Sequence, residues 1–172
     1  KYDDLIPNLN LTTGVDARTY EGVHYREVVN LLGGDYYVDF SDDNDASNAD
    51  KVKRVGDKVA YHNIGYNSWI GGFVQGEYSL DALTAFFSAA GSNTSYQRED
   101  FFNYTDDSGE QKSEKADYPG SAIKLGANYN VNENINVFFN AGALSIAPNF
   151  RSVYLNYNNT VNPEAKNEDI TS

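Results

Sequence analysis

An acidic segment, residues 39–50, is the part of this sequence whose residue types and spacing best fit a metal site. Oxygen-bearing side chains occupy positions 1, 3, 5, 7, 9 and 12 of the calcium-loop template, a spacing that can wrap one hard cation. Asn44 replaces the turn glycine of that template, and Asp50 replaces its bidentate glutamate. Two hypotheses therefore stand: a solvated acidic loop, which these departures favour, and a calcium site formed by Asp39, Ser41, Asp43, Asp45 and Asp50.

Aromatic side chains gather in segments that we expect to be loops. Tyrosine offers a large rigid contact surface with a polar tip, which suits the binding of sugars, peptides or chelates. The alternative is that these rings pack the loops against one another. The candidate ligand-binding residues are Tyr36, Tyr37, Tyr61, Tyr66, Tyr96, Arg98, Phe101, Phe102 and Tyr104.

Catalytic chemistry has little support in the sequence. The two histidines, His24 and His62, do not adjoin a Gly-x-Ser-x-Gly turn, and there is no glycine-rich phosphate-binding motif. The chain has no cysteine, which excludes disulfides, cysteine-ligated zinc and thiol nucleophiles. We therefore expect that the protein is not an enzyme and needs no cofactor, the calcium alternative aside.

Composition narrows the class of protein further. The 172 residues include 13 lysines and arginines against 25 aspartates and glutamates, a net charge of −12, so nucleic acid is excluded as a partner. Aromatic residues make up 14% of a chain whose mean hydropathy is −0.60, which is too aromatic for disorder. No apolar stretch approaches the roughly 20 residues of a membrane-spanning helix.

Alternation of polar and apolar residues with period two predicts an all-β protein. The clearest run is 123–131, where Ile123, Leu125 and Tyr129 alternate with Lys124 and other polar residues. Helical periodicity is confined to short pieces such as residues 26–32. The five predicted strands are residues 9–19, 69–78, 83–94, 123–131 and 136–143.

Connection lengths between these strands alternate between long and short, which is typical of transmembrane β-barrels. The connections 79–82 and 132–134 are short, whereas 20–68, 97–121 and the segment after residue 144 are long. Tyr78 and Tyr129 lie beside the short turns on the apolar parity, where an aromatic girdle belongs. We therefore predict an antiparallel up-and-down transmembrane β-barrel segment, about five strands of a larger barrel, because small barrels need about eight strands to close.

Short segments in order along the chain resemble the barrel domain of TonB-dependent outer-membrane receptors of Gram-negative bacteria. Residues 71–78 are similar to a recurring Gly-Phe-x-Gln-x-Glu-Tyr strand, and residues 162–168 to an Asn-Pro-x-x-x-x-Glu stretch that opens a later strand. Residues 147–150 resemble an Arg-Ala-Pro signature, with Ile146 in place of the arginine. No segment resembles the plug domain of that family, so residues 1–172 are expected to be a partial outer-membrane β-barrel domain.

The resemblance implies a role in nutrient uptake across the bacterial outer membrane. External loops would capture the ligand, and TonB, driven by the proton-motive force, would pull on a plug domain inside the barrel. The implied partners are outer-membrane lipid, TonB, the plug domain and, by analogy, a surface lipoprotein that lids the barrel. Chelated iron, cobalamin, oligosaccharides and peptides all stay open as ligands.

An alternative from another class is a secreted soluble β-sandwich. It would bind carbohydrate through its tyrosines and hold calcium in the 39–50 loop. Such a protein would cover the apolar parity of each strand with a second sheet rather than with lipid.

Overall fold

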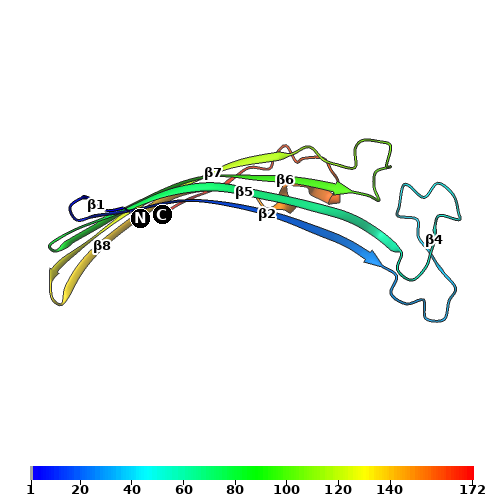
Figure 1. Cartoon of the computed structure of the whole chain (residues 1–172), viewed down its shortest axis with the longest axis horizontal. Helices are drawn as coiled ribbons and strands as arrows, with labels where there is room; N and C mark the ends of the chain where they lie inside the picture. Colours follow the sequence, from blue (N-terminus) through cyan, green and yellow to red (C-terminus); the bar gives the residue numbers. More distant parts are fainter. Residues whose placement is uncertain (1) are drawn as a thin grey trace.

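The sequence forms one long, curved antiparallel sheet (Figure 1). The computed structural model describes residues 2–172, with side chains from Pro7 onward. Seven strands pair in the order β1-β2-β5-β6-β7-β8-β9, and β3 and β4 form a separate two-stranded ribbon. The strands are β1 (Tyr2–Ile6), β2 (Leu9–Glu27), β3 (Tyr37–Val38), β4 (Val52–Lys53), β5 (Lys58–Leu80), β6 (Leu83–Asp100), β7 (Ala116–Asn132), β8 (Ile135–Ile146) and β9 (Glu168–Thr171).

Strand register brings all five predicted apolar stripes onto one face of the sheet, which we call the apolar face. One row across it joins Thr13, Val74, Ala89, Ile123 and Ala143, each directly opposite the next. Because side chains alternate along a strand, the polar parities share the opposite side, which we call the polar face. The apolar face includes Leu11, Val15, Tyr78, Phe87, Leu125, Tyr129, Val137 and Phe139.

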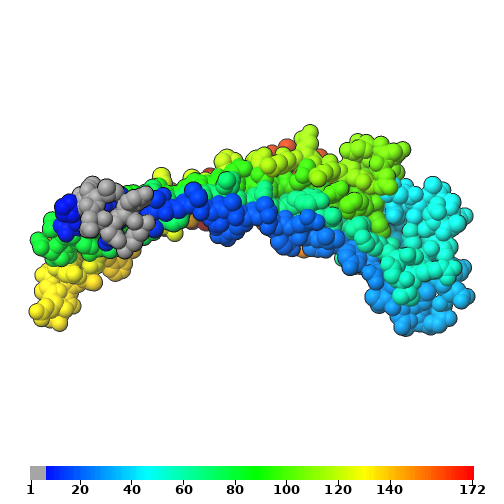
Figure 2. All heavy atoms as spheres, in the orientation of Figure 1, coloured from blue at the N-terminus to red at the C-terminus, as the bar shows by residue number. Residues whose placement is uncertain are grey.

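Short turns lie at one end of the sheet and long loops at the other, as predicted from the connection lengths. Two-residue turns join β5 to β6 and β7 to β8, and the first of them places Asp81 in the left-handed region at φ 49°. Loops 28–57, 101–115 and 147–167 lie at the other ends of the strands. Figure 2 shows the first of these loops gathered at one tip of the elongated molecule.

The strands extend well past the predicted boundaries, and residues 26–32, which show helical periodicity in the sequence, form the end of β2 and the start of the following loop. β2 continues to Glu27 and β5 begins at Lys58, with Val23 opposite Ile64. Residues 20–27 carry polar groups on both parities, so hydrophobic alternation fades while the backbone ladder continues. The predicted 20–68 connection therefore consists of the end of β2, loop 28–57 and the beginning of β5.

Glycine and aromatic residues face each other across the sheet at three positions. Phe73 lies over Gly14, where an added Cβ would come within 2.6 Å of the ring. Phe87 covers Gly76 on the apolar face, and Phe86 covers Gly126 on the polar face. The glycine leaves room for the ring to lie flat on the neighbouring strand, and the ring covers the exposed glycine backbone.

A small core forms where the loop after β8 folds back over the polar face. The loop contains a helical turn, α1 (Phe150–Val153), and a 3-10 turn, η1 (Leu155–Tyr157), and Val153 is fully buried. Val153 and Tyr154 pack with Tyr96 and Ala116 of the sheet. Apart from this loop, the described part of the chain has one layer.

Within residues 2–172 the sheet remains open, with β1 and β9 at its edges. The all-β antiparallel prediction is confirmed, and the predicted count of about five strands corresponds to the five long ones. The described residues contain no helix of the length and apolar character needed to cross a membrane.

Candidate functional site

The two loops 28–57 and 101–115 are joined by direct hydrogen bonds. The Asp43 amide donates to the Phe102 carbonyl at 2.8 Å, and the Asn44 side chain donates to the Phe101 carbonyl at 2.9 Å. The Asp106 amide returns a bond to Asn44 Oδ1 at 2.8 Å. These loops therefore form one connected structure at the end of the sheet.

The carboxylates of the acidic segment bind separate partners and do not converge on one point. Asp39 is buried and accepts from the Ser41 hydroxyl at 2.6 Å and from the Ala60 amide at 3.0 Å. Asp45 pairs with Lys53 at 2.6 Å. Among residues 2–172 no three acidic, histidine or cysteine side chains stand together as a metal site. Calcium binding at this loop stays a prediction, with no preformed ligand set to support it.

Asp39 has a structural task at an irregularity of the sheet. The register of the β2–β5 pairing shifts between Tyr25, which lies opposite His62, and Arg26, which lies opposite Val59. Ala60, in the bulge on β5, adopts the left-handed region at φ 67°. An amide displaced from the ladder needs another acceptor. The Asp39 carboxylate supplies it.

An aromatic and basic cluster lies beside this bulge. His62 stacks on Phe101, with ring centroids 4.4 Å apart, and meets Tyr25 edge-on. Lys58 Nζ donates to His62 Nε2 at 2.9 Å. Burial, followed by the charge of Lys58, lowers the pKa of His62 below its ordinary value of 6.5. The folded cluster therefore favours neutral histidine.

A buried ion pair within β6 is bonded to the loop after β8 through its arginine. The guanidinium of Arg98 donates to Asp100 at 2.6 Å and to Asn159 Oδ1 at 2.8 Å. Burial acts to raise the pKa of Asp100, but bonds from the Asn103 and Phe102 amides, the Asn103 side chain and Arg98 together hold it below the ordinary value. Asn159 also donates to the carbonyls of loop 101–115, so this network locks loop 147–167 down.

The candidate ligand-binding residues divide by burial. Tyr36 and Tyr37 are 55% and 50% exposed and remain free to meet a ligand. Tyr96, Arg98 and Phe102 are buried, so they present little surface at the external loops. The others contact protein groups at the loop bases: Tyr66 with Glu99, Tyr61 with Arg26, Phe101 with His62, and Tyr104 with Asn159.

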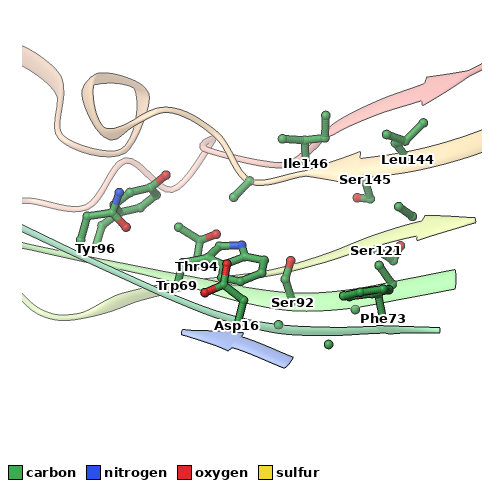
Figure 3. A pocket seen from close by; sticks show the side chains of 17 residues that line it. Asp16, Trp69, Phe73, Ser92, Thr94, Tyr96, Ser121, Leu144, Ser145 and Ile146 are labelled. Carbon is green, nitrogen blue, oxygen red and sulfur yellow. The ribbon is translucent and has the colours of Figure 1, made fainter. Parts of the chain in front are cut away.

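A groove of about 500 Å³ lies on the polar face below loop 147–167 (Figure 3). Its floor consists of small residues, where side chains are short or absent: Gly71, Gly72, Ala90, Gly91, Ser92 and Ala122. Larger side chains stand around this floor, with Trp69, Thr94 and Tyr96 toward the loops and Phe73 and Leu144 toward the turns. The hollow exists because rows of small residues run between rows of large ones.

Polar groups line one side of the groove. Asp16 pairs with Arg18, and the Arg18 guanidinium lies over the Trp69 ring, 5.3 Å from its centroid. Asn67 Oδ1 is buried and has no hydrogen-bond partner among the described residues. A buried acceptor of this kind is costly to leave unpaired.

Sequence reasoning did not select this groove, although the signal was present. The alternation of β5 places Trp69, Gly71 and Phe73 on the polar parity, where large aromatic rings are unexpected beside water. What could not be read from one strand was the pairing with Ser92 and Ala122 of other strands.

Comparison of this chain with protein-family models, with curated proteins and with solved structures gives no match.

Proposed function

We propose that this chain forms part of the wall of a transmembrane β-barrel in a TonB-dependent outer-membrane receptor, which binds a scarce nutrient at its external loops and imports it into the periplasm. The observation that carries the proposal is the uncovered apolar face shared by five consecutive long strands. Val15 is 89% exposed and Phe139 is 60% exposed. Contiguous exposed apolar surface of this kind requires lipid or another protein layer.

The dimensions of the apolar face support lipid as the cover. Along β7 the apolar side chains run from Ile123 to Val131, a span of about 26 Å at ~3.3 Å per residue. A strand tilt of about 40° reduces this to about 20 Å, close to the ~25 Å apolar band of outer-membrane barrels. Tyr78 and Tyr129 lie toward the short turns, at the position of an interfacial girdle.

The loops supply the capture surface in this proposal. They lie at the end away from the short turns, and Tyr36 and Tyr37 remain exposed there. The transport step would be mechanical, with TonB pulling on a plug domain inside the barrel and no covalent change made by this chain. Outer-membrane lipid, TonB, the plug domain and a surface lipoprotein are the proposed partners.

Two neighbouring phenylalanines provide a matched test. Phe138 and Phe139 are 72% and 60% exposed and point to opposite faces of β8. Because residues 1–172 contain no cysteine, Phe138→Cys and Phe139→Cys each introduce one spin-label site within them. With the protein in lipid vesicles, we expect the label at 139 to collide with oxygen, which dissolves in lipid, and the label at 138 with a water-soluble nickel chelate.

A soluble β-sandwich gives a different result. The protein would then be stable without detergent, and the label at 139 would be shielded from both reagents by a second sheet. Equal access of the nickel chelate to both labels would also reject the lipid-facing assignment.

A further inference from the structure

We propose that His62 is a pH-sensitive switch: loops 28–57 and 101–115 stay joined while its side chain is neutral, and they part when acid protonates it. The inference goes beyond the proposed function, because it concerns the end of the sheet that carries the long loops and does not depend on what covers the apolar face. It assigns this end a closed arrangement at neutral pH and an open arrangement in acid.

The two loops meet at the backbone of Phe101 and Phe102. The Phe102 carbonyl accepts the Asp43 amide at 2.8 Å, and the Phe101 carbonyl accepts the Asn44 side chain at 2.9 Å. The His62 carbonyl in turn accepts the Phe101 amide at 2.9 Å. A displacement of His62 would therefore disturb the backbone to which the first loop is bonded.

The imidazole of His62 also packs against this backbone through its ring. It stacks on Phe101, with ring centroids 4.4 Å apart, and Phe102 meets it edge-on at 6.3 Å. Tyr25 of β2 meets it edge-on at 6.2 Å. Rings from β2, β5 and the second loop thus surround one group that can change its charge near physiological pH.

The contact between Lys58 and His62 requires a neutral imidazole. Lys58 Nζ lies 2.9 Å from His62 Nε2, and because an ammonium group can only donate, the ring nitrogen that it meets must carry a free lone pair. Protonation would put an N–H there, so that repulsion between two positive charges replaces a hydrogen bond. Lys58 Nζ also lies over the Tyr25 ring, 5.1 Å from its centroid, which favours its position beside the histidine.

Two aspartates act on His62 from other elements, and both already have partners. Asp100 of β6 is paired with Arg98 at 2.6 Å, and Asp42 of the first loop accepts a backbone amide of that loop at 2.9 Å. Their charges act to raise the pKa of His62, but burial and the charge of Lys58 outweigh them and leave this pKa below 6.5. Protonation is therefore more favourable once the loops have parted and water reaches the ring, so acid shifts the equilibrium toward the open arrangement.

A pair of spin labels measures the separation of the two loops. Ala46→Cys and Asp107→Cys place one label on each loop at exposed positions. With the protein in lipid vesicles, pulsed electron spin resonance gives the distribution of distances between the two labels. We expect one short-distance population at about pH 8, and a second, longer-distance population whose share grows as the pH falls to about 5.

Two matched pairs of variants identify the group that responds. His62→Phe keeps an aromatic ring against Phe101 but cannot be protonated, so the loops should stay closed throughout, whereas His24→Gln removes the other histidine and should respond like the wild type. Lys58→Met removes the like charge, and we expect it to reduce the longer-distance share at about pH 5 by roughly twofold or more. Lys51→Met should leave that share unchanged, since Lys51 is not bonded to the histidine.

Three results would overturn the inference. Unchanged distances down to about pH 5 would mean that Lys58 turns away on protonation and the loops remain joined. Opening of His62→Phe to the same extent as the wild type would mean that carboxylates respond to acid instead. Loss of the response in His24→Gln would assign the switch to the wrong histidine. The spin-label comparison of residues 138 and 139 is independent of these measurements, so the receptor proposal and this inference can fail separately.

Discussion

Asp39 illustrates how a residue with the right type and spacing for a metal ligand can serve the backbone instead. Its carboxylate accepts the Ala60 amide at the bulge in β5. We predict that Asp39→Asn lowers the free energy of local opening around Ala60 by about 1–3 kcal/mol, because an amide replaces a charged acceptor. Hydrogen exchange of residues 58–62, followed by mass spectrometry, measures this change.

Asp43→Asn is the control for that measurement. Asp43 occupies another position of the calcium template, but its side chain is exposed. If both variants changed exchange equally, and only when calcium was present, the metal hypothesis would be correct and the bulge assignment wrong.

The pKa of His62 gives a second prediction at this scale. The pKa of His62 is lower in the folded protein than in the unfolded chain, where it is near 6.5. Neutral His62 therefore contributes fully to the stability of the folded cluster above pH 6.5, and this contribution is lost as the pH falls through the folded-state pKa. We expect Lys58→Met to raise the His62 pKa toward 6.5, because it removes the nearby positive charge. With two histidines in the chain, an NMR titration resolves both.

Lys51→Met is the matched variant for this titration, since Lys51 lies over Phe40 rather than beside His62. An unchanged His62 pKa in Lys58→Met would leave burial as the sole cause of the depression.

Among the elements, loop 147–167 depends most on tertiary contacts. The Tyr154 hydroxyl accepts from Ser113 Oγ at 3.0 Å and lies 3.1 Å from the carbonyl oxygens of both Tyr96 and Glu114. We predict that Tyr154→Phe lowers the free energy of loop opening by about 1–2 kcal/mol, since these buried groups lose their partner. Limited proteolysis should then cut within residues 147–167 several times faster.

Tyr157→Phe is the control, because it removes a tyrosine hydroxyl from a side chain of the same loop that is 73% exposed. We expect the protease to cut the loop of this variant at the wild-type rate. Equal acceleration in both variants would mean that the Tyr154 hydroxyl does not hold the loop.

The contrast between strands and loops also shows what the sequence can reveal. Residues 123–131 were predictable as a strand because alternate side chains face an apolar and a polar environment. The sequence there alternates between apolar and polar residues for that reason. Residues 20–27 extend the same ladder, but both parities there are polar and the pattern disappears. Loop 147–167 folds back over the sheet through contacts between residues far apart in the sequence. For example, the Phe150 ring packs over Gly65, where an added Cβ would lie 3.3 Å from the ring. No local pattern encodes such a contact, and the groove beneath the loop was missed for the same reason.

For the whole molecule, the two faces of the sheet predict opposite responses to charge. Ile123 is 58% exposed on the apolar face, and its neighbour Lys124 is on the polar face. The double variant Ile123→Lys with Lys124→Ile keeps the composition and moves one charge to the apolar face. In lipid vesicles we expect it to lower the unfolding free energy by about 2–4 kcal/mol, as measured by guanidinium titration of Trp69 emission.

The wild-type protein in the same vesicles is the control. Unchanged stability in the double variant would mean that water, rather than lipid, covers Ile123.

The extension of β2 and β5 beyond the apolar face has an electrostatic consequence. About nine residues of β2 follow the apolar stretch, which lifts loop 28–57 roughly 30 Å further along the strand. That loop carries seven aspartates against three lysines and arginines, a net charge of −4. It therefore projects a negative potential into solution, screened over about 8 Å at physiological salt. Anionic solutes would approach this tip more slowly at low ionic strength, whereas a neutral sugar would diffuse past it at the same rate in any salt.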